Sequence, residues 1–168
     1  MNVGALVITA GQNGAAMIPV GKLSAGQRMA ALFQKIGADI AAVVTGADDK
    51  PLEKQLSQSG VLLLPFEETG NREDCARAGL NYLCGKCERV FLLDEDRPLV
   101  LPDTLRKMLC CRGEMIVPTY EGKPGKPVLL SAGAVRKTLN QARPKLNTVY
   151  VPVEDEAVLL PAGDCARL

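Results

Sequence analysis

A short apolar run that stops at three acids constrains the fold of this chain more than any other feature. Val90 to Leu93 are four apolar residues, as in a fully buried strand, and Asp94, Glu95 and Asp96 follow at once. Ligands of open α/β sheets bind at the carboxyl ends of the strands, so acids there can hold a divalent cation and, through it, a phosphate. Because side chains alternate along a strand, we expect Asp94 and Asp96 to point the same way and Glu95 to point the other. A solvated turn capped by acids is the alternative.

The combination of a short apolar run and a helical pattern recurs along the chain. We expect further strands at 3–9, 40–45, 61–65, 114–118 and 128–130, a late edge strand at 149–153, and helices at 24–36, 51–59, 71–83, 103–109 and 132–140. The tail from residue 154 is left unassigned. Strands and helices at this interval predict right-handed βαβ units. The sequence therefore predicts one α/β domain over residues 1–168, with a mainly parallel, three-layer, Rossmann-like sheet.

Composition narrows the range of functions. The chain has 168 residues, of which 47% are hydrophobic and 4% aromatic, and its net charge is +1. The low aromatic content favours a parallel sheet covered by helices over a platform on which single-stranded nucleic acid stacks. The small net charge gives no overall field that would favour DNA or a membrane surface. The complete absence of His excludes catalytic triads and His-ligated zinc. With no basic residue before Lys22 and no apolar run of about 18 residues, we expect a cytoplasmic protein.

A loop of small residues follows the first expected strand. Strand, glycine-rich loop and helix in this order allow backbone N–H groups to approach phosphates. The loop has neither Walker nor dinucleotide-binding spacing. Lys22 is the nearest cation that could reach a phosphate, although a lone lysine is more often simply solvated. The predicted nucleotide-binding residues of the loop are Ala10, Gly11, Gln12, Asn13 and Gly14.

A second loop combines glycines and lysines. Residues 120–127 read Tyr-Glu-Gly-Lys-Pro-Gly-Lys-Pro, which places Lys123 and Lys126 in one turn. The two ammonium groups could meet an anionic substrate. A plain hairpin turn is equally consistent with this composition.

Four cysteines raise the question of zinc, because four thiolates with a Cys-x-x-Cys pair can hold this metal. Adjacent cysteines are awkward ligands for one tetrahedral ion, and a gap of 22 residues matches no common zinc finger. Free thiols in a reducing compartment are therefore favoured over a structural zinc site. The residues concerned are Cys84, Cys87, Cys110 and Cys111, all expected at the amino-terminal edge of the sheet.

The order of these motifs resembles a known family. Residues 90–105 follow the family's pattern of a strand, Gly-Asp-x-Pro and a helix. Residues 116–130 are similar to its segment with Val-Pro and Gly-x-x-Gly-His-Pro. Residues 76–80 resemble its Ser-Leu-x-x-Gly-Leu helix, and residues 6–11 resemble its first strand and loop. Together they resemble the molybdopterin cytidylyl- and guanylyltransferases, over about residues 3 to 139. The implied fold is that of the nucleotide-diphospho-sugar transferases.

The resemblance implies a reaction and a set of roles. A pterin phosphate would attack the α-phosphorus of CTP or GTP and release pyrophosphate, with Mg²⁺ at Asp96 and, on the strand geometry above, at Asp94. Lys22 would close the nucleotide loop, and Thr45 and Gly46 would lie near the nucleotide. Positioning and charge neutralisation would carry the rate, with Asp96 and Lys22 as catalytic residues. Transfer to a sugar or polyol phosphate on the same scaffold is an alternative.

Several positions depart from the family pattern. Residues 13–22 lack the family's Ser-x-Arg-Met-Gly, and no later Gly-Asp-x-Gly-x-Arg or Asp-Thr-Pro segment is present. Glu95 replaces the Gly before the aspartate, Lys126 the His of Gly-His-Pro, and Cys75 the Ser that begins the Ser-Leu-x-x-Gly helix. These departures motivate a further alternative, a non-catalytic member that binds nucleotide, pterin or a partner protein.

Overall fold

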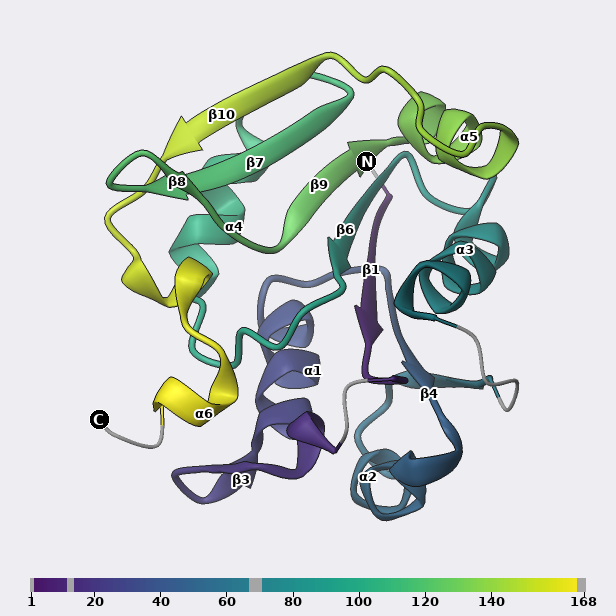
Figure 1. Ribbon diagram of the computed structural model, residues 1–168, viewed down its shortest axis with the longest axis vertical. Helices are drawn as coiled ribbons and strands as arrows, with labels where there is room; N and C mark the ends of the chain where they lie inside the picture. The colour runs from purple at the N-terminus through teal and green to yellow at the C-terminus, as the bar shows by residue number, and fades with distance from the viewer. Residues whose placement is uncertain (1, 12–13, 67–70, 166–168) are drawn as a thin grey trace.

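In the described part of the chain, eight strands form one mixed sheet, which carries the core of the fold. The computed structural model describes residues 2–11, 14–66 and 71–165 (Figure 1). Within these ranges eight strands lie in the order β10-β7-β9-β6-β1-β4-β5, with β8 paired to β7. β9 runs antiparallel to both of its neighbours, whereas β6, β1, β4 and β5 are parallel. The strands are β1 (Val3–Ile8), β4 (Ile40–Thr45), β5 (Leu62–Pro65), β6 (Arg89–Leu93), β7 (Met115–Tyr120), β8 (Lys123–Pro124), β9 (Val128–Ser131) and β10 (Thr148–Pro152).

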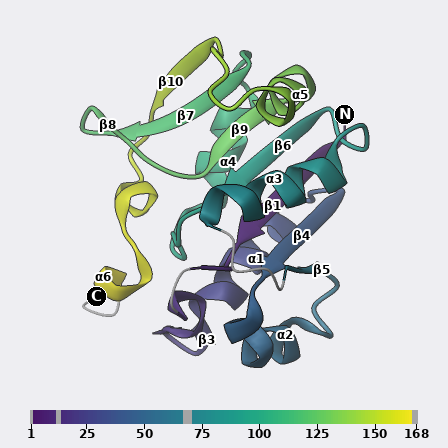
Figure 2. The ribbon, with the colours of Figure 1, turned by 45° about the vertical axis from the view of Figure 1, so that its right-hand side comes forward.

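Helices cover both faces of the sheet, which gives the three layers expected from the sequence (Figure 2). One face packs against α1 (Ala25–Lys35), α2 (Lys50–Leu56) and α4 (Pro102–Leu109). The other packs against α3 (Arg72–Leu83) and α5 (Ala132–Asn140). Since residues alternate between the faces, Val7 joins the first core and Leu6 the second. The expected α/β class, the mainly parallel core and the late edge strand are confirmed.

Local sequence signals explain where the helices begin. Ser24 caps α1 in a capping box, in which its hydroxyl accepts from the Gln27 N–H and the Gln27 side chain accepts from the Ser24 N–H. Asn71 caps α3 in the same manner by accepting from the Asp74 N–H. The second expected helix begins one residue early, at Lys50, after the 3-10 helix η2 (Ala47–Asp49).

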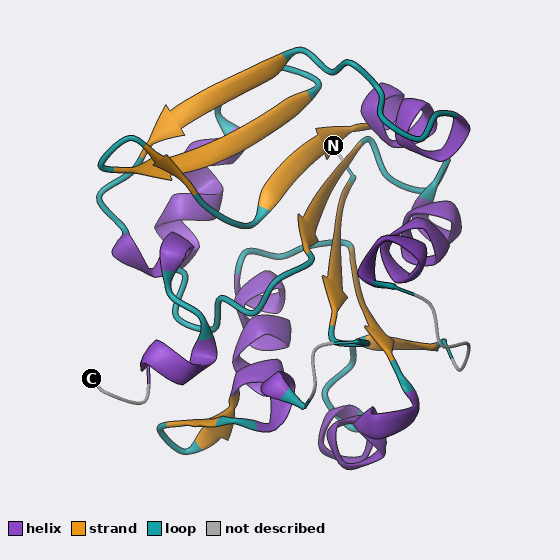
Figure 3. Cartoon of the chain, in the orientation of Figure 1, coloured by secondary structure: helices purple, strands orange, loops and turns teal. Residues whose placement is uncertain are grey.

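Two segments had no sequence assignment or a wrong one. Residues 15 and 16, expected to be loop, begin the 3-10 helix η1 (Ala15–Met17). Residues 17–23, which had no assignment, include the end of η1 and most of a hairpin of β2 (Pro19–Val20) and β3 (Leu23–Ser24). The unassigned tail forms η3 (Glu156–Leu159) and α6 (Ala162–Cys165), which return the chain to the end of β6 (Figure 3). Among the described residues, no helix is long and apolar enough to cross a membrane.

Candidate active site

Loops from four strands meet at one edge of the sheet. β1, β4 and β6 all end there, and β9 begins there because Leu92 of β6 pairs with Val128 of β9 in an antiparallel register. Lys126, two residues before β9, therefore lies beyond the end of β6. The loop after β6, residues 94–97, is called the acidic loop below. This edge is the ordinary place for a ligand in an open α/β sheet.

A buried carboxylate ties the ends of β1 and β4 together. Asp49 is 3% exposed, and its Oδ2 accepts hydrogen bonds from the Thr9 hydroxyl at 2.9 Å and the Gly46 N–H at 2.7 Å. The Thr9 hydroxyl also lies 3.1 Å from the Val44 carbonyl oxygen. Sequence analysis missed Asp49, and its only signal was its place just after an expected strand.

The two predicted nucleotide loops touch each other. A Cβ on Gly46 would stand 3.3 Å from both Cα and Cβ of Ala10, so only glycine fits this approach without a shift. Gly11 and Gly14 both have left-handed backbones, at φ 73° and 77°. Thr45 is buried and its hydroxyl donates to Glu53 at 2.7 Å, so this side chain faces the protein rather than the edge. Gln12 and Asn13 lie outside the described residues.

Lys22 occupies a turn that the sequence did not reveal. It is exposed between β2 and β3, where Gly21 adopts φ 69°. β2 contacts α6, and α6 begins at Ala162, which binds the acidic loop. Lys22 and the acidic loop therefore share α6 as a neighbour.

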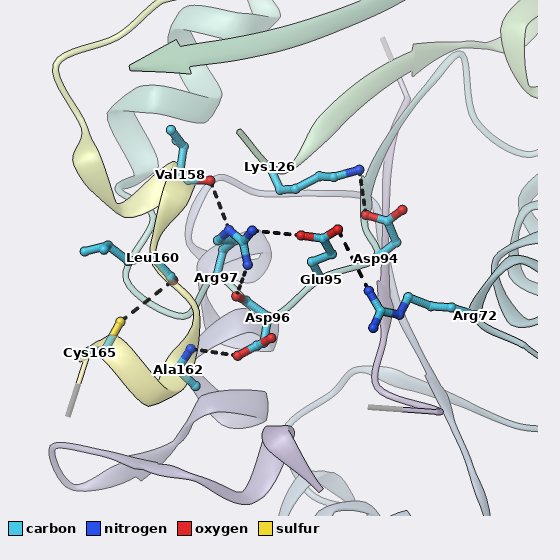
Figure 4. A network of polar contacts seen from close by, with 10 residues as sticks. All are labelled: Arg72, Asp94, Glu95, Asp96, Arg97, Lys126, Val158, Leu160, Ala162 and Cys165. Carbon is cyan, nitrogen blue, oxygen red and sulfur yellow. Dashed lines mark hydrogen bonds and ion pairs between the residues drawn. The ribbon is translucent and has the colours of Figure 1, made fainter. Parts of the chain in front are cut away.

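Three cations pair with the acids of the acidic loop, two from elsewhere in the chain and one, Arg97, from the loop itself (Figure 4). Oδ1 of Asp94 lies 2.9 Å from Nζ of Lys126. Glu95 pairs with Arg97 at 2.8 Å and, more loosely, with Arg72 of α3 at 3.8 Å. Lys123, the other lysine of residues 120–127, is exposed in β8.

The tail of the chain holds the acidic loop in place. We call residues 155–165 the C-terminal segment. The Ala162 N–H donates to Oδ2 of Asp96 at 2.6 Å, and the Arg97 Nε–H donates to the Val158 carbonyl at 3.1 Å. The same carbonyl accepts from the Lys126 N–H at 3.0 Å. Three segments far apart in sequence thus converge on one site.

The expectation that Asp94 and Asp96 share a face is not met. β6 ends at Leu93, so strand alternation does not extend through the acidic loop. Asp94 turns to Lys126, whereas Asp96 turns to the C-terminal segment (Figure 4).

The donor set still suits a hard divalent cation at Asp96. Mg²⁺ is usually held by one or two carboxylates together with substrate phosphates and water. Ala162 occupies only Oδ2 of Asp96, and Oδ1 has no hydrogen-bond partner among the described residues. Asp94 fits less well, because an ammonium group already lies against it.

The structure does not assemble the considered zinc site. Among the described residues, no three His, Cys, Asp or Glu side chains gather as a metal site, and all six cysteines are free. The pairs Cys84 and Cys87, and Cys110 and Cys111, precede β6 and β7, which are separated by β9. Burial raises the pKa of Cys87, as expected of a packed thiol.

A small pocket opens beside the acidic loop, between α3 and α5. Its volume is about 260 Å³, and Arg72, Arg77, Thr138 and Asp94 are among its lining residues. The guanidinium of Arg77 donates to the carbonyl oxygens of Thr138 and Leu139, both at 2.6 Å. Two acids, Glu73 and Asp94, line the pocket beside the two arginines, so a bound molecule would meet both signs of charge.

Comparisons with known proteins agree with this architecture. The family model described as MobA-like NTP transferase domain matches residues 11–160. No curated protein matches the sequence significantly.

Solved structures share the fold at low identity. A nucleotidyl transferase from Methanothermobacter has a TM-score of 0.79 and 18% identity, over 99% of this chain and 95% of that one. A 4-diphosphocytidyl-2C-methyl-D-erythritol synthase from Anaerococcus prevotii has a TM-score of 0.79 and 14% identity over the same shares. Mycobacterium tuberculosis Rv0371c, solved with manganese, has a TM-score of 0.74 and 16% identity, over 91% and 89%.

Proposed function

Because the chain belongs to the MobA-like NTP transferase domain family, and is thereby a nucleotidyltransferase, we propose that it transfers a nucleotidyl group from CTP or GTP to a molybdopterin-type phosphate. The observation that carries this proposal is the meeting of the Ala10–Gly46 contact, the acidic loop and Lys126 at one sheet edge. A phosphate-binding loop and an acidic loop at such an edge are the two parts that nucleotidyl transfer requires.

The nucleotide would lie over the loops after β1 and β4. Residues 10–14 and Gly46 would offer backbone N–H groups to the phosphates, and the buried Asp49 carboxylate keeps the two loops in register. Lys22 would approach the triphosphate from the β2–β3 turn, where it is exposed. The side chain of Thr45 takes no part in this arrangement, since it is bonded to Glu53.

Asp96 would hold Mg²⁺, whose bound charge would offset the negative charge of the triphosphate. The manganese complex of Rv0371c supports the use of a divalent ion on this scaffold. Ala162 positions the Asp96 carboxylate by donating to one of its two oxygens.

The reaction needs no histidine in this chain. The acceptor phosphate is already ionised at neutral pH, and its oxygen would form a bond to the α-phosphorus while the bond to the β-phosphate oxygen breaks and pyrophosphate leaves. Lys22 would stabilise charge on the departing pyrophosphate. Lys123, Lys126 and Arg72 would orient the acceptor phosphate near the acidic loop.

The pocket between α3 and α5 is a candidate for the acceptor. Arg72 would offer its guanidinium to a phosphate there, Glu73 and Asp94 would offer acceptors to hydroxyl or amino groups, and a volume of about 260 Å³ suits a compact molecule. A polyol phosphate is the second candidate acceptor, because the Anaerococcus synthase named for a diphosphocytidyl-methylerythritol shares the fold at a TM-score of 0.79.

Calorimetric titration with CTP, GTP and ATP, with and without Mg²⁺, tests the proposal. We expect one of the first two to bind in a metal-dependent manner, and then to release pyrophosphate when molybdopterin is added. Absence of binding to all three would instead support a non-catalytic member of the family, and turnover with a polyol phosphate alone would support the second acceptor.

Asp96→Ala should abolish the metal-dependent part of triphosphate binding and leave the unfolding midpoint within a few degrees of the wild-type value. Asp103→Ala is the matched control, because this carboxylate is 91% exposed and pairs only within α4. A large loss of stability with unchanged binding would give Asp96 a structural role.

A further inference from the structure

The ion pair between Lys126 and Asp94 places a fixed positive charge in the acidic loop. Nζ of Lys126 lies 2.9 Å from Oδ1 of Asp94, and both side chains are only 26% exposed. Oδ1 is shielded from solvent. Most surface lysines are solvated and contribute little through ion pairs, so a partly buried pair at a ligand-binding edge is unusual.

The backbone holds Lys126 in position from both sides. Its N–H donates to the Val158 carbonyl at 3.0 Å, and the preceding Gly125 N–H donates to the Pro118 carbonyl at 2.8 Å. Gly125 lies so close to Val158 that a Cβ would stand 2.6 Å from Val158 atoms. Val128 then pairs with Leu92 in the sheet. The ammonium group therefore starts from a well-anchored main chain.

The charges of the acidic loop are unequally compensated. Asp94 faces Lys126, and Glu95 faces Arg97 and Arg72. Asp96 receives a neutral backbone N–H, from Ala162. A divalent cation at Asp94 would have to approach or displace an ammonium group of the same sign. Among the described residues no cationic side chain pairs with the Asp96 carboxylate, and Arg97 donates instead to the Asp96 backbone carbonyl at 2.7 Å.

We propose that Lys126 is a resident cation that excludes metal from Asp94 and supplies part of the charge neutralisation that the triphosphate needs. The divalent ion then binds through Asp96 alone, and triphosphate binding depends less on Mg²⁺ than it would without Lys126. The role of Lys126 in neutralising the triphosphate rests on the proposed function. The statement about metal binding rests on the ion pair itself.

The first test measures Mn²⁺ binding to the protein alone, by titration followed with electron paramagnetic resonance. Lys126→Met should bind Mn²⁺ at least about tenfold more tightly than the wild type, because the repelling ammonium group is gone and the Asp94 carboxylate becomes available to the ion. The double variant Lys126→Met/Asp94→Asn should lose this gain. An unchanged or lower Mn²⁺ affinity in Lys126→Met would overturn the proposal.

Two further variants separate charge from folding. Lys126→Arg keeps the positive charge and should bind Mn²⁺ as the wild type does. Lys137→Met removes a lysine from another lysine–carboxylate pair, with Glu114 at 2.6 Å and remote from the acidic loop, and should leave Mn²⁺ binding unchanged. If Lys126→Arg behaves as Lys126→Met does, the charge is not responsible and the proposal fails.

The second test compares the dissociation constant of CTP with and without Mg²⁺. This ratio should be at least about tenfold larger in Lys126→Met than in the wild type, since the variant has lost its own cation at the site. An equal ratio in both proteins would overturn the inference. Failure of the proposed function would look different: no triphosphate would bind to any variant, while the Mn²⁺ titration would still decide the role of Lys126.

Discussion

The two halves of the candidate site use carboxylates in opposite ways. At the ends of β1 and β4, the Asp49 carboxylate is 3% exposed and accepts only from neutral donors, a hydroxyl and a backbone N–H. In the acidic loop, Asp94 and Glu95 are partly exposed and face charged side chains. The Thr9 hydroxyl and the Gly46 N–H cannot bind a substrate instead of Asp49 without disrupting the fold. The ion pairs of Asp94 and Glu95 can rearrange around a ligand. Asp49 is therefore structural, Asp94 and Glu95 can exchange their partners for a ligand, and Asp96 lies between these cases because the Ala162 N–H occupies only one of its oxygens.

The largest expected effect is on the structural half. Asp49→Ala leaves the Gly46 N–H without its acceptor and the Thr9 hydroxyl with only the more distant Val44 carbonyl, and it removes a buried side chain, which together should lower the free energy of unfolding by about 3 kcal/mol. For a chain of this size the unfolding midpoint should fall by about 6–12 °C. Urea denaturation measures the first value and calorimetry the second.

Asp49→Asn is the informative control, because it keeps an acceptor oxygen of the same size and should cost clearly less stability than Asp49→Ala. If Asp49→Ala instead unfolds like the wild type but loses nucleotide, the contrast between the two halves is wrong.

A smaller effect should appear in binding. Lys22→Ala should weaken triphosphate binding about tenfold and monophosphate binding less, because one charge-assisted hydrogen bond to the outer phosphates is lost. Stability should not change, since Lys22 is exposed in a turn. Calorimetric titration with CTP and CMP makes the comparison. Equal weakening for both nucleotides would remove Lys22 from the triphosphate site.

The smallest effect concerns Glu114, which lies away from the candidate site. Its pair with Lys137 shows how much an accessible ion pair contributes to folding stability. The hydrogen bond from Lys137, and then the one from the Asn147 N–H, lower the pKa of Glu114 below its ordinary value. A carboxyl whose pKa is lowered by folding stabilises the protein above its unfolded pKa, and this contribution is lost as the pH falls through the folded value.

Glu114→Gln should therefore reduce stability slightly at neutral pH and flatten its decline between about pH 5 and pH 3. Urea midpoints measured across this range test the expectation. A wild-type slope retained in Glu114→Gln would assign the pH dependence to other acids.

The sequence predicts the regular parts of the fold because their signals are local. The apolar run 90–93, the Ser24 cap and the amphipathic pattern of 132–140 each lie within one element, and each element is present. The hairpin at 19–24 has strands of two residues each, too short for any periodic pattern.

Side-chain partners could not be predicted in the same way. Asp94 meets Lys126 only because β9 is inserted antiparallel between β6 and β7, which no local pattern encodes. The prediction that Asp94 and Asp96 point the same way assumed that the strand continues through both residues. In the structure the strand ends at Leu93. The binding roles of Lys22, Lys123 and Lys126 remain predictions for the experiments above.

The hydrogen bonds between the C-terminal segment and the acidic loop also have a consequence for biosynthesis. Asp96 and Ala162 are separated by 66 positions, and Arg97 and Val158 by 61. At about 5–20 residues per second, the ribosome adds Ala162 about 3–13 s after Asp96. During that interval the emerging chain carries its acidic loop without the backbone groups that fix it. The loop can acquire its final geometry only after Ala162 has been made, when all the described strands of the sheet have already been synthesised.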